Sequence, residues 1–152
     1  MTGVQPCALP ISHPAAVTAA AVGLPETLFV SASKSGTTAE VTALTAYFYQ
    51  QVKAERGRAA GENFVAITDA GSALQRYAEA HDFRRCFLNP ADVGGRFSVL
   101  TAFGMVPAAL LGLDLERMFC SAYAARAASE VDTPDADPST LRLGQADRKS
   151  VV

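Results

Sequence analysis

The sequence of 152 residues predicts an α/β fold, a three-layer α/β/α sandwich on a mainly parallel sheet that this chain holds only in part. Two observations carry the prediction. Short apolar segments alternate along the chain with longer segments whose apolar residues recur at helical spacing. The short segments are continuously apolar rather than alternately apolar and polar, which is typical of parallel strands buried on both faces.

The expected strands are three short apolar runs, residues 28–30, 64–67 and 86–88. Each run ends at a polar or proline-containing turn. Parallel strands place their carboxyl ends at one edge of the sheet, and α/β proteins bind ligands at that edge. The loops there have unusual compositions: residues 33–38, 68–71 and 89–98.

The first expected helix follows the first strand, with Glu40 in its first turn and an end before Gly57 or Gly61. Its apolar residues recur at helical spacing: Val41, Leu44, Phe48 and Val52. A second helix should open at Gly71-Ser72 and carry Leu74, Tyr77 and Ala78 on one face. Both helices connect consecutive strands, as a parallel sheet requires.

A third expected helix is almost wholly apolar and carries Val99, Leu100, Phe103, Val106 and Leu110. Pro107 lies inside it and should kink it, because proline removes a backbone hydrogen bond. Asp114 can cap a fourth helix, from Leu115 to about Ser129.

The two ends of the chain have neither periodicity nor turn signals. Residues 1–12 and 147–152 are therefore expected to be non-native, resembling translated adaptor sequence left at the edges of assembled sequencing reads. Residues 13–130 form the expected domain, and the acidic, proline-containing residues 131–146 form a linker and the start of a further segment.

Composition narrows the class of protein. Hydrophobic residues make up 49% and charged residues 18%, as in a core-forming domain, and a net charge of -2 gives no general attraction to nucleic acid or anionic lipid. No apolar stretch approaches the ~18 residues of a membrane span, and no basic leader is present, so a cytoplasmic protein is expected. The chain has three cysteines, Cys7, Cys86 and Cys120. Their odd number and the lack of metal-ligand spacing predict neither a disulfide framework nor a metal site. Cys86 is expected in the core.

The loop after the first strand, within "SASKSGTTAEV", is rich in hydroxyl groups: Ser33, Ser35, Thr37 and Thr38. A strand-to-helix turn aims unpaired N–H groups and the positive end of a helix dipole at one spot, which suits a phosphate. Gly36 allows close backbone approach, and Lys34 adds charge. A simpler use is a capping box with Thr37 as N-cap and Glu40 three residues later; both uses are compatible. Lys34 precedes Gly36, unlike the order of a Walker loop, so a phosphorylated metabolite is favoured over a nucleotide.

The segment "SKSGTTAE" resembles the sugar-phosphate signature of SIS (sugar isomerase) domains. The segment "NPADVGGRFSVLTAFGMVPAALLGLD", residues 89–114, resembles the VGGR[FY]S region of glucose-6-phosphate isomerases. The resemblance covers about residues 24–144, and it is greatest to the isomerase half of bacterial fused transaldolase–glucose-6-phosphate isomerases. It implies a SIS-type, flavodoxin-like sandwich and a hexose 6-phosphate as ligand.

The family's roles pass to matching positions of this chain. The resemblance implies that Ser33, Ser35 and Thr38 bind the phosphate and that Lys34, Gly36 and Thr37 complete the loop. Arg96 would stabilise the charge of an enediol intermediate in the interconversion of glucose 6-phosphate and fructose 6-phosphate, a step of glycolysis and gluconeogenesis. Gly94 and Gly95 would let the backbone pass close to substrate. No cofactor is implied, and full-length members are expected to be homo-oligomers.

The resemblance also implies a carboxylate base, a histidine and a lysine that would follow the stretch present here. The available residues are not expected to replace them: Glu40 suits a helix start, His81 a helix end, and His13 lies in the unreliable first segment. The chain is therefore expected to be an inactive fragment of the isomerase. Three alternatives stay open: a SIS module that binds sugar phosphate without converting it, half of a glucosamine-6-phosphate-forming enzyme, and a structural α/β segment without ligand.

Overall fold

The structure is a computed structural model that describes residues 23–128. The chain divides into two compact units, residues 1–111 and residues 112–152, which are described separately. The segments expected to be non-native, 1–12 and 147–152, and the expected linker 131–146 lie outside the described residues.

The first unit contains a parallel sheet of three strands in the order β1 (Phe29–Ala32), β2 (Phe64–Asp69) and β3 (Arg85–Asn89). Val30 pairs with Val65, and Ile67 pairs with Phe87. All three strands confirm the predictions, and each extends one or two residues beyond its apolar run. The extensions matter because they place Thr68, Asp69 and Asn89 inside the sheet.

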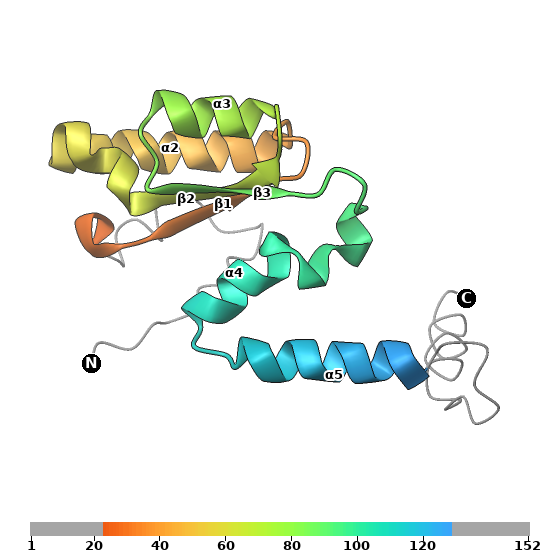
Figure 1. Ribbon diagram of the computed structural model, residues 1–152. Coiled ribbons are helices and arrows are strands. Elements are labelled where there is room, and N and C mark those ends of the chain that lie inside the picture. The colour runs from red at the N-terminus through yellow and green to blue at the C-terminus, as the bar shows by residue number, and fades with distance from the viewer. Residues whose placement is uncertain (1–22, 129–152) are drawn as a thin grey trace, which may run out of the picture. The chain divides into compact units, whose positions relative to one another are not determined.

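Helices cover both faces of this sheet. The helices α2 (Ala39–Arg56) and α3 (Ala73–Ala80) lie on one face, and α4 (Ala102–Leu110) lies on the other, as Figure 1 shows. The predicted three-layer α/β/α arrangement is therefore confirmed for the part of the sheet described. Gly57 ends α2 with a positive φ of 59°, and the hydroxyl of Ser72 caps α3 by accepting from Gln75 N at 3.0 Å.

The third helix begins later than the sequence predicted. Val99 and Leu100 lie instead in a 3₁₀ helix, Gly95–Leu100, and are 62% and 43% exposed. The reason is local: Thr101 caps α4 by accepting from Phe103 N at 3.3 Å, and its own hydroxyl donates to Ser98 O. A Cβ at Gly104 would lie 2.0 Å from Val99 O, so only glycine permits this tight reversal into α4.

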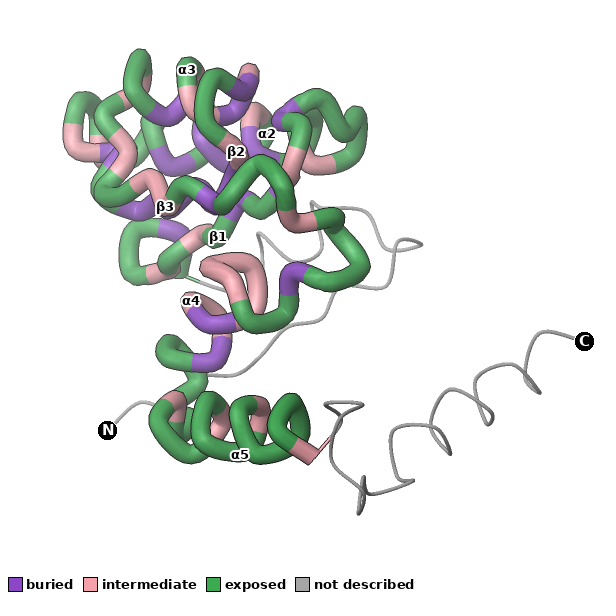
Figure 2. Tube along the Cα trace, turned by 45° about the vertical axis from the view of Figure 1, so that its right-hand side comes forward, coloured by how far each residue is buried: buried purple, intermediate pink, exposed green. Residues whose placement is uncertain are grey.

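The core lies between β2 and α2, where buried residues gather (Figure 2). Phe64 is fully buried, and its ring centroid lies 4.8 Å from that of Phe29 and 5.1 Å from that of Phe83. Leu44, one of the apolar residues at helical spacing in α2, is 43% exposed. Thr45 is buried in its place, with its hydroxyl 2.8 Å from the Ser31 hydroxyl.

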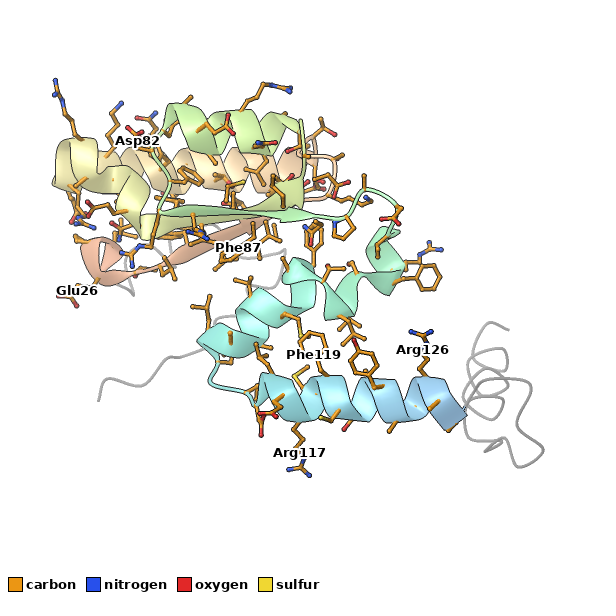
Figure 3. The ribbon with its side chains drawn as sticks, viewed as in Figure 1. Glu26, Asp82, Phe87, Arg117, Phe119 and Arg126 are labelled. Atoms are coloured by element: carbon orange, nitrogen blue, oxygen red, sulfur yellow. The ribbon has the colours of Figure 1, made fainter. Side chains whose placement is uncertain are left out.

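The second unit contains α5 (Leu115–Ala128), which confirms the fourth predicted helix. Asp114 Oδ1 accepts from Arg117 N at 2.9 Å, so the predicted cap is present. Arg117 and Phe119 point to opposite sides of the helix in Figure 3. Within residues 23–128, every helix is too short or too polar to serve as a membrane span.

Candidate functional site

Three loops meet at the carboxyl edge of the sheet, on the right in Figure 1. We call them the hydroxyl loop (residues 33–38, after β1), the second loop (residues 68–72, at the end of β2) and the third loop (residues 89–98, from the end of β3). The sequence predicts residues 33–38, 68–71 and 89–98 at one edge of the sheet. The parallel register of the strands confirms that placement.

The hydroxyl loop is held together by its own side chains. The hydroxyl of Ser33 is 2.9 Å from that of Thr38 and accepts from Gly36 N at 3.1 Å. The hydroxyl of Ser35 is 2.9 Å from that of Thr37 and accepts from Thr37 N at 3.2 Å. Ser33 is buried, whereas Ser35, Thr37 and Thr38 are exposed. The loop thus has one buried hydroxyl and three at its surface, and all four bond within the loop.

Gly36 is required where it stands. Its φ is +69°, and a Cβ would lie 2.5 Å from Leu74 N and 3.0 Å from Ala73 N. The hydroxyl loop therefore rests directly on the first turn of α3. Behind it lies a largely apolar cavity of about 140 Å³, lined by Gly36, Thr42, Thr45, Ala73, Leu74 and Tyr77.

The predicted capping box is not formed. Helix α2 begins after Thr38, not Thr37, and the side chain of Thr38 makes no capping hydrogen bond. Its hydroxyl bonds to Ser33 instead, and Thr37 bonds to Ser35, so both threonines serve the loop. The first N–H groups of an α-helix have no partner within the helix, and here no side-chain cap satisfies them. This end of α2 is consequently a site of positive potential beside exposed hydroxyls.

The second loop fastens the hydroxyl loop to the sheet. The buried hydroxyl of Thr68 donates to Ser33 O at 2.7 Å and also lies 2.7 Å from the Ser72 hydroxyl. Asp69 N donates to Lys34 O at 3.2 Å, and Ser33 N donates to Ile67 O at 3.0 Å. These bonds fix the backbone of the first two loop residues with respect to β2.

Replacement of Thr68 by valine is expected to lower the free energy of unfolding by about 1–3 kcal/mol, because it leaves the buried Ser33 carbonyl and Ser72 hydroxyl without their partner. Valine keeps the shape of threonine, so packing is retained. Urea unfolding of the two proteins measures the difference. Thr42→Val is the control, since Thr42 is exposed, and a loss as large in the control would contradict the assignment.

Lys34 and the third loop meet at the same edge. Lys34 Nζ forms an ion pair with Asp69 Oδ2 and donates to Ala91 O at 3.3 Å. Asn89 is buried, and its amide donates to Thr68 O at 3.3 Å. The sequence predicts Thr68, Asp69 and Asn89 at the ends of strands and in the loops of this edge, but it does not single out their side chains as part of the site. Their polar side chains at the end of apolar runs were the signal that could have found them.

Arg96 lies in the Gly95–Leu100 3₁₀ helix, with an exposed side chain. Within residues 23–128, its guanidinium makes no hydrogen bond or ion pair. The structure therefore places Arg96 in the third loop and shows no polar contact between its side chain and the hydroxyl loop. Gly94 has a φ of -62°, and a Cβ at Gly95 would meet nothing within 4 Å. The fold itself therefore does not demand glycine at these two positions.

The remaining candidates have structural surroundings. Glu40 is exposed in the first turn of α2, and His81 ends α3 with its ring stacked on Tyr77 at 4.0 Å. Cys86 packs against the Ala66, Leu74 and Ala78 cluster. Burial, followed by the charge of Glu79, raises the pKa of the Cys86 thiol, so it stays protonated at neutral pH and is a poor nucleophile. Among the described residues, no three His, Cys, Asp or Glu side chains are arranged to hold a metal ion.

Comparison with known proteins gives sequence relatives, although no family model matches the chain. The chain is 40% identical over 97 residues to a glucose-6-phosphate isomerase of Clostridioides difficile, covering 63% of this chain and 22% of that protein. It is 39% identical over 121 residues to the glucose-6-phosphate isomerase of Clostridium novyi, covering 78% of this chain and 26% of the relative. A probable glucose-6-phosphate isomerase of Natronomonas pharaonis is 39% identical over 103 residues, with 68% and 24% covered.

The fold has a counterpart among solved structures. The crystal structure of a hypothetical protein from Thermus thermophilus superposes with a TM-score of 0.78 at 30% identity, over 88% of this chain and 33% of that one. The chain thus spans about a quarter of the length of the curated relatives and a third of the solved structure. By sequence, the chain is related to the glucose-6-phosphate isomerases over about a quarter of their length.

Proposed function

We propose that the chain binds the phosphate group of a hexose 6-phosphate in the hydroxyl loop, as part of a glucose-6-phosphate isomerase. The observation that carries the proposal is the loop itself, which joins exposed hydroxyls of Ser35, Thr37 and Thr38 to the uncapped start of α2. Hydroxyl and N–H donors at a helix start are suited to a phosphate, and Lys34 adds a cation at the rim. Ser33 lies underneath and keeps the loop in shape.

Arg96 is proposed to act on the sugar rather than on the phosphate. Aldose–ketose isomerisation removes a proton next to a carbonyl, and a guanidinium lowers the energy of the resulting enediolate. The glycines before Arg96 support this role, because the fold does not require them and a substrate passing close to the backbone would. The full reaction would interconvert glucose 6-phosphate and fructose 6-phosphate, in glycolysis and gluconeogenesis.

This chain alone is proposed to bind without turnover. Of the carboxylates in the three loops, Asp69 is ion-paired to Lys34 and the other, Asp92, is exposed in the turn after β3. Asp69 is thus engaged by Lys34, whereas a general base must be free to reach the proton that it abstracts from the sugar. The proton-transferring carboxylate is therefore assigned to the part of the relatives that this chain does not match.

Titration calorimetry with glucose 6-phosphate and with glucose tests the binding. We expect weak binding of glucose 6-phosphate, none of glucose, and a loss of about tenfold or more in the Ser35→Ala/Thr38→Ala double variant, because two donors to a charged group are removed. Ser121→Ala in α5 is the control for loss of an exposed hydroxyl. Equal affinities for glucose and its phosphate, or an unaffected double variant, would refute the phosphate site.

A coupled assay for fructose 6-phosphate formation tests the proposal that this chain binds the sugar phosphate without converting it. No rate above background is expected from the chain by itself. A clear rate that disappears on Arg96→Ala substitution would show that the chain carries its own base, and the proposal of a binding-only segment would be withdrawn.

A further inference from the structure

Lys34 is the side chain that connects all three loops of the site. Its backbone carbonyl accepts from Asp69 N at 3.2 Å, its ammonium pairs with Asp69 Oδ2, and the same ammonium donates to Ala91 O at 3.3 Å. Ala91 lies five residues before Arg96 in the third loop. The position of the Lys34 ammonium is thus linked to the hydroxyl loop, to β2 and to the segment that carries Arg96.

The ammonium has capacity left for a ligand. A lysine ammonium has three N–H donors, and Asp69 and Ala91 take two of them. The side chain is 32% exposed, so the third donor can reach an anion from solvent. An unrestrained lysine would sample many rotamers, and holding one of them for a ligand would oppose binding by lost entropy.

Asp69 is built to act as a fixed anchor. It is the last residue of β2, and its register partner on β3 is the buried Asn89. Its side chain is only 18% exposed, and its Oδ1 is enclosed without a hydrogen-bond donor among the described residues. Lys34 is therefore the cation that balances this carboxylate, and a group on a strand is held more rigidly than one on a loop.

We infer that Asp69 is a positioning residue for Lys34, holding its ammonium between the hydroxyl loop and the third loop so that one donor faces the anion. The part of this inference that concerns the anion rests on the proposed function; the part that concerns Lys34 does not. Asp69 itself is not assigned a contact with the ligand, because both of its oxygens are taken up or enclosed.

Competitive acetylation, read for each lysine by mass spectrometry, tests the positioning without a sugar. The chain has an internal reference in Lys53, which is exposed on α2. In the wild type, Lys34 is expected to react several-fold more slowly than Lys53. Asp69→Ala should raise the Lys34 rate close to that of Lys53 and leave Lys53 unchanged. An unchanged Lys34 rate in a variant with unaltered thermal unfolding overturns the inference.

If Asp69→Ala does not fold, Asp69→Asn decides the question. An amide oxygen can still accept from the ammonium but lacks the charge, so an intermediate Lys34 rate is expected, and a rate equal to wild type overturns the inference. Glu79→Gln on α3 is the control for loss of an exposed acidic charge.

Inorganic phosphate distinguishes positioning from simple electrostatics. Removal of a negative charge beside an anion site should tighten phosphate binding if charge alone matters. If Asp69 acts by positioning the Lys34 ammonium, the opposite is expected: Asp69→Ala weakens phosphate binding by about three- to fivefold, and Asp69→Asn restores it. Tighter binding in Asp69→Ala overturns the inference. If phosphate fails to bind or protect Lys34 in the wild type while Asp69→Ala still exposes Lys34, the proposed function fails and the positioning of Lys34 by Asp69 is upheld.

Discussion

Gly36→Ala is expected to abolish phosphate binding and to lower the free energy of unfolding by about 2–4 kcal/mol. Two effects add. Alanine is strained at the φ of +69°, and its Cβ would lie 2.5 Å from the backbone nitrogen of Leu74. A backbone atom of α3 cannot turn aside, so the hydroxyl loop must lift away from the helix. Chemical unfolding and phosphate calorimetry measure the two losses.

Gly71→Ala separates the two effects. Gly71 also has a positive φ, of 74°, but a Cβ there would meet nothing within 4 Å. It is expected to lose only about 1 kcal/mol and to keep phosphate binding. Equal behaviour of the two variants would mean that contact between the hydroxyl loop and α3 contributes nothing to the site.

Phe64→Ala should produce the largest loss of stability in the first unit, about 3–5 kcal/mol, since it empties a fully buried position among stacked rings. Three rings surround that of Phe64: Phe29, Phe83 and Tyr49. The space that alanine would leave in the core therefore cannot close without movement of both β1 and α2. Urea unfolding measures the change.

The matched control is Phe97→Ala, because Phe97 is 81% exposed and should change the free energy of unfolding by less than about 0.5 kcal/mol. A Phe64→Ala variant as stable as this control would place the core elsewhere than between β2 and α2.

Most of the elements in residues 23–128 could be predicted because their signals are local. Continuous apolar runs mark β1, β2 and β3, and Ser72 and Asp114 mark helix starts by the hydrogen bonds that their side chains make. The start of α4 could not be predicted. It depends on Thr101 and on the contact between Gly104 and the Val99 carbonyl, which an apolar helical pattern does not reveal.

The residues of the candidate site could be predicted from the sequence, but the hydrogen bonds and the ion pair among them could not. The hydroxyl loop stands out in the sequence, yet the pattern of Thr37 and Glu40 suggested a capping box that does not form. Hydroxyls have several partners within reach, and Ser33 and Ser35 are the partners that the folded loop provides. The pairing of Lys34 with Asp69 joins residues 35 positions apart in the chain, so it follows from the parallel register and not from local pattern.

The cavity behind the hydroxyl loop gives the molecule a spectroscopic reporter. The chain has no tryptophan and four tyrosines, and one of them, Tyr77, lines that cavity together with Gly36. Its ring stacks on His81, which also contacts Tyr49 edge-on at 4.6 Å. Tyrosine emission and near-ultraviolet circular dichroism of the unlabelled chain should therefore register anion binding in the hydroxyl loop, through the changed surroundings of the Tyr77 ring.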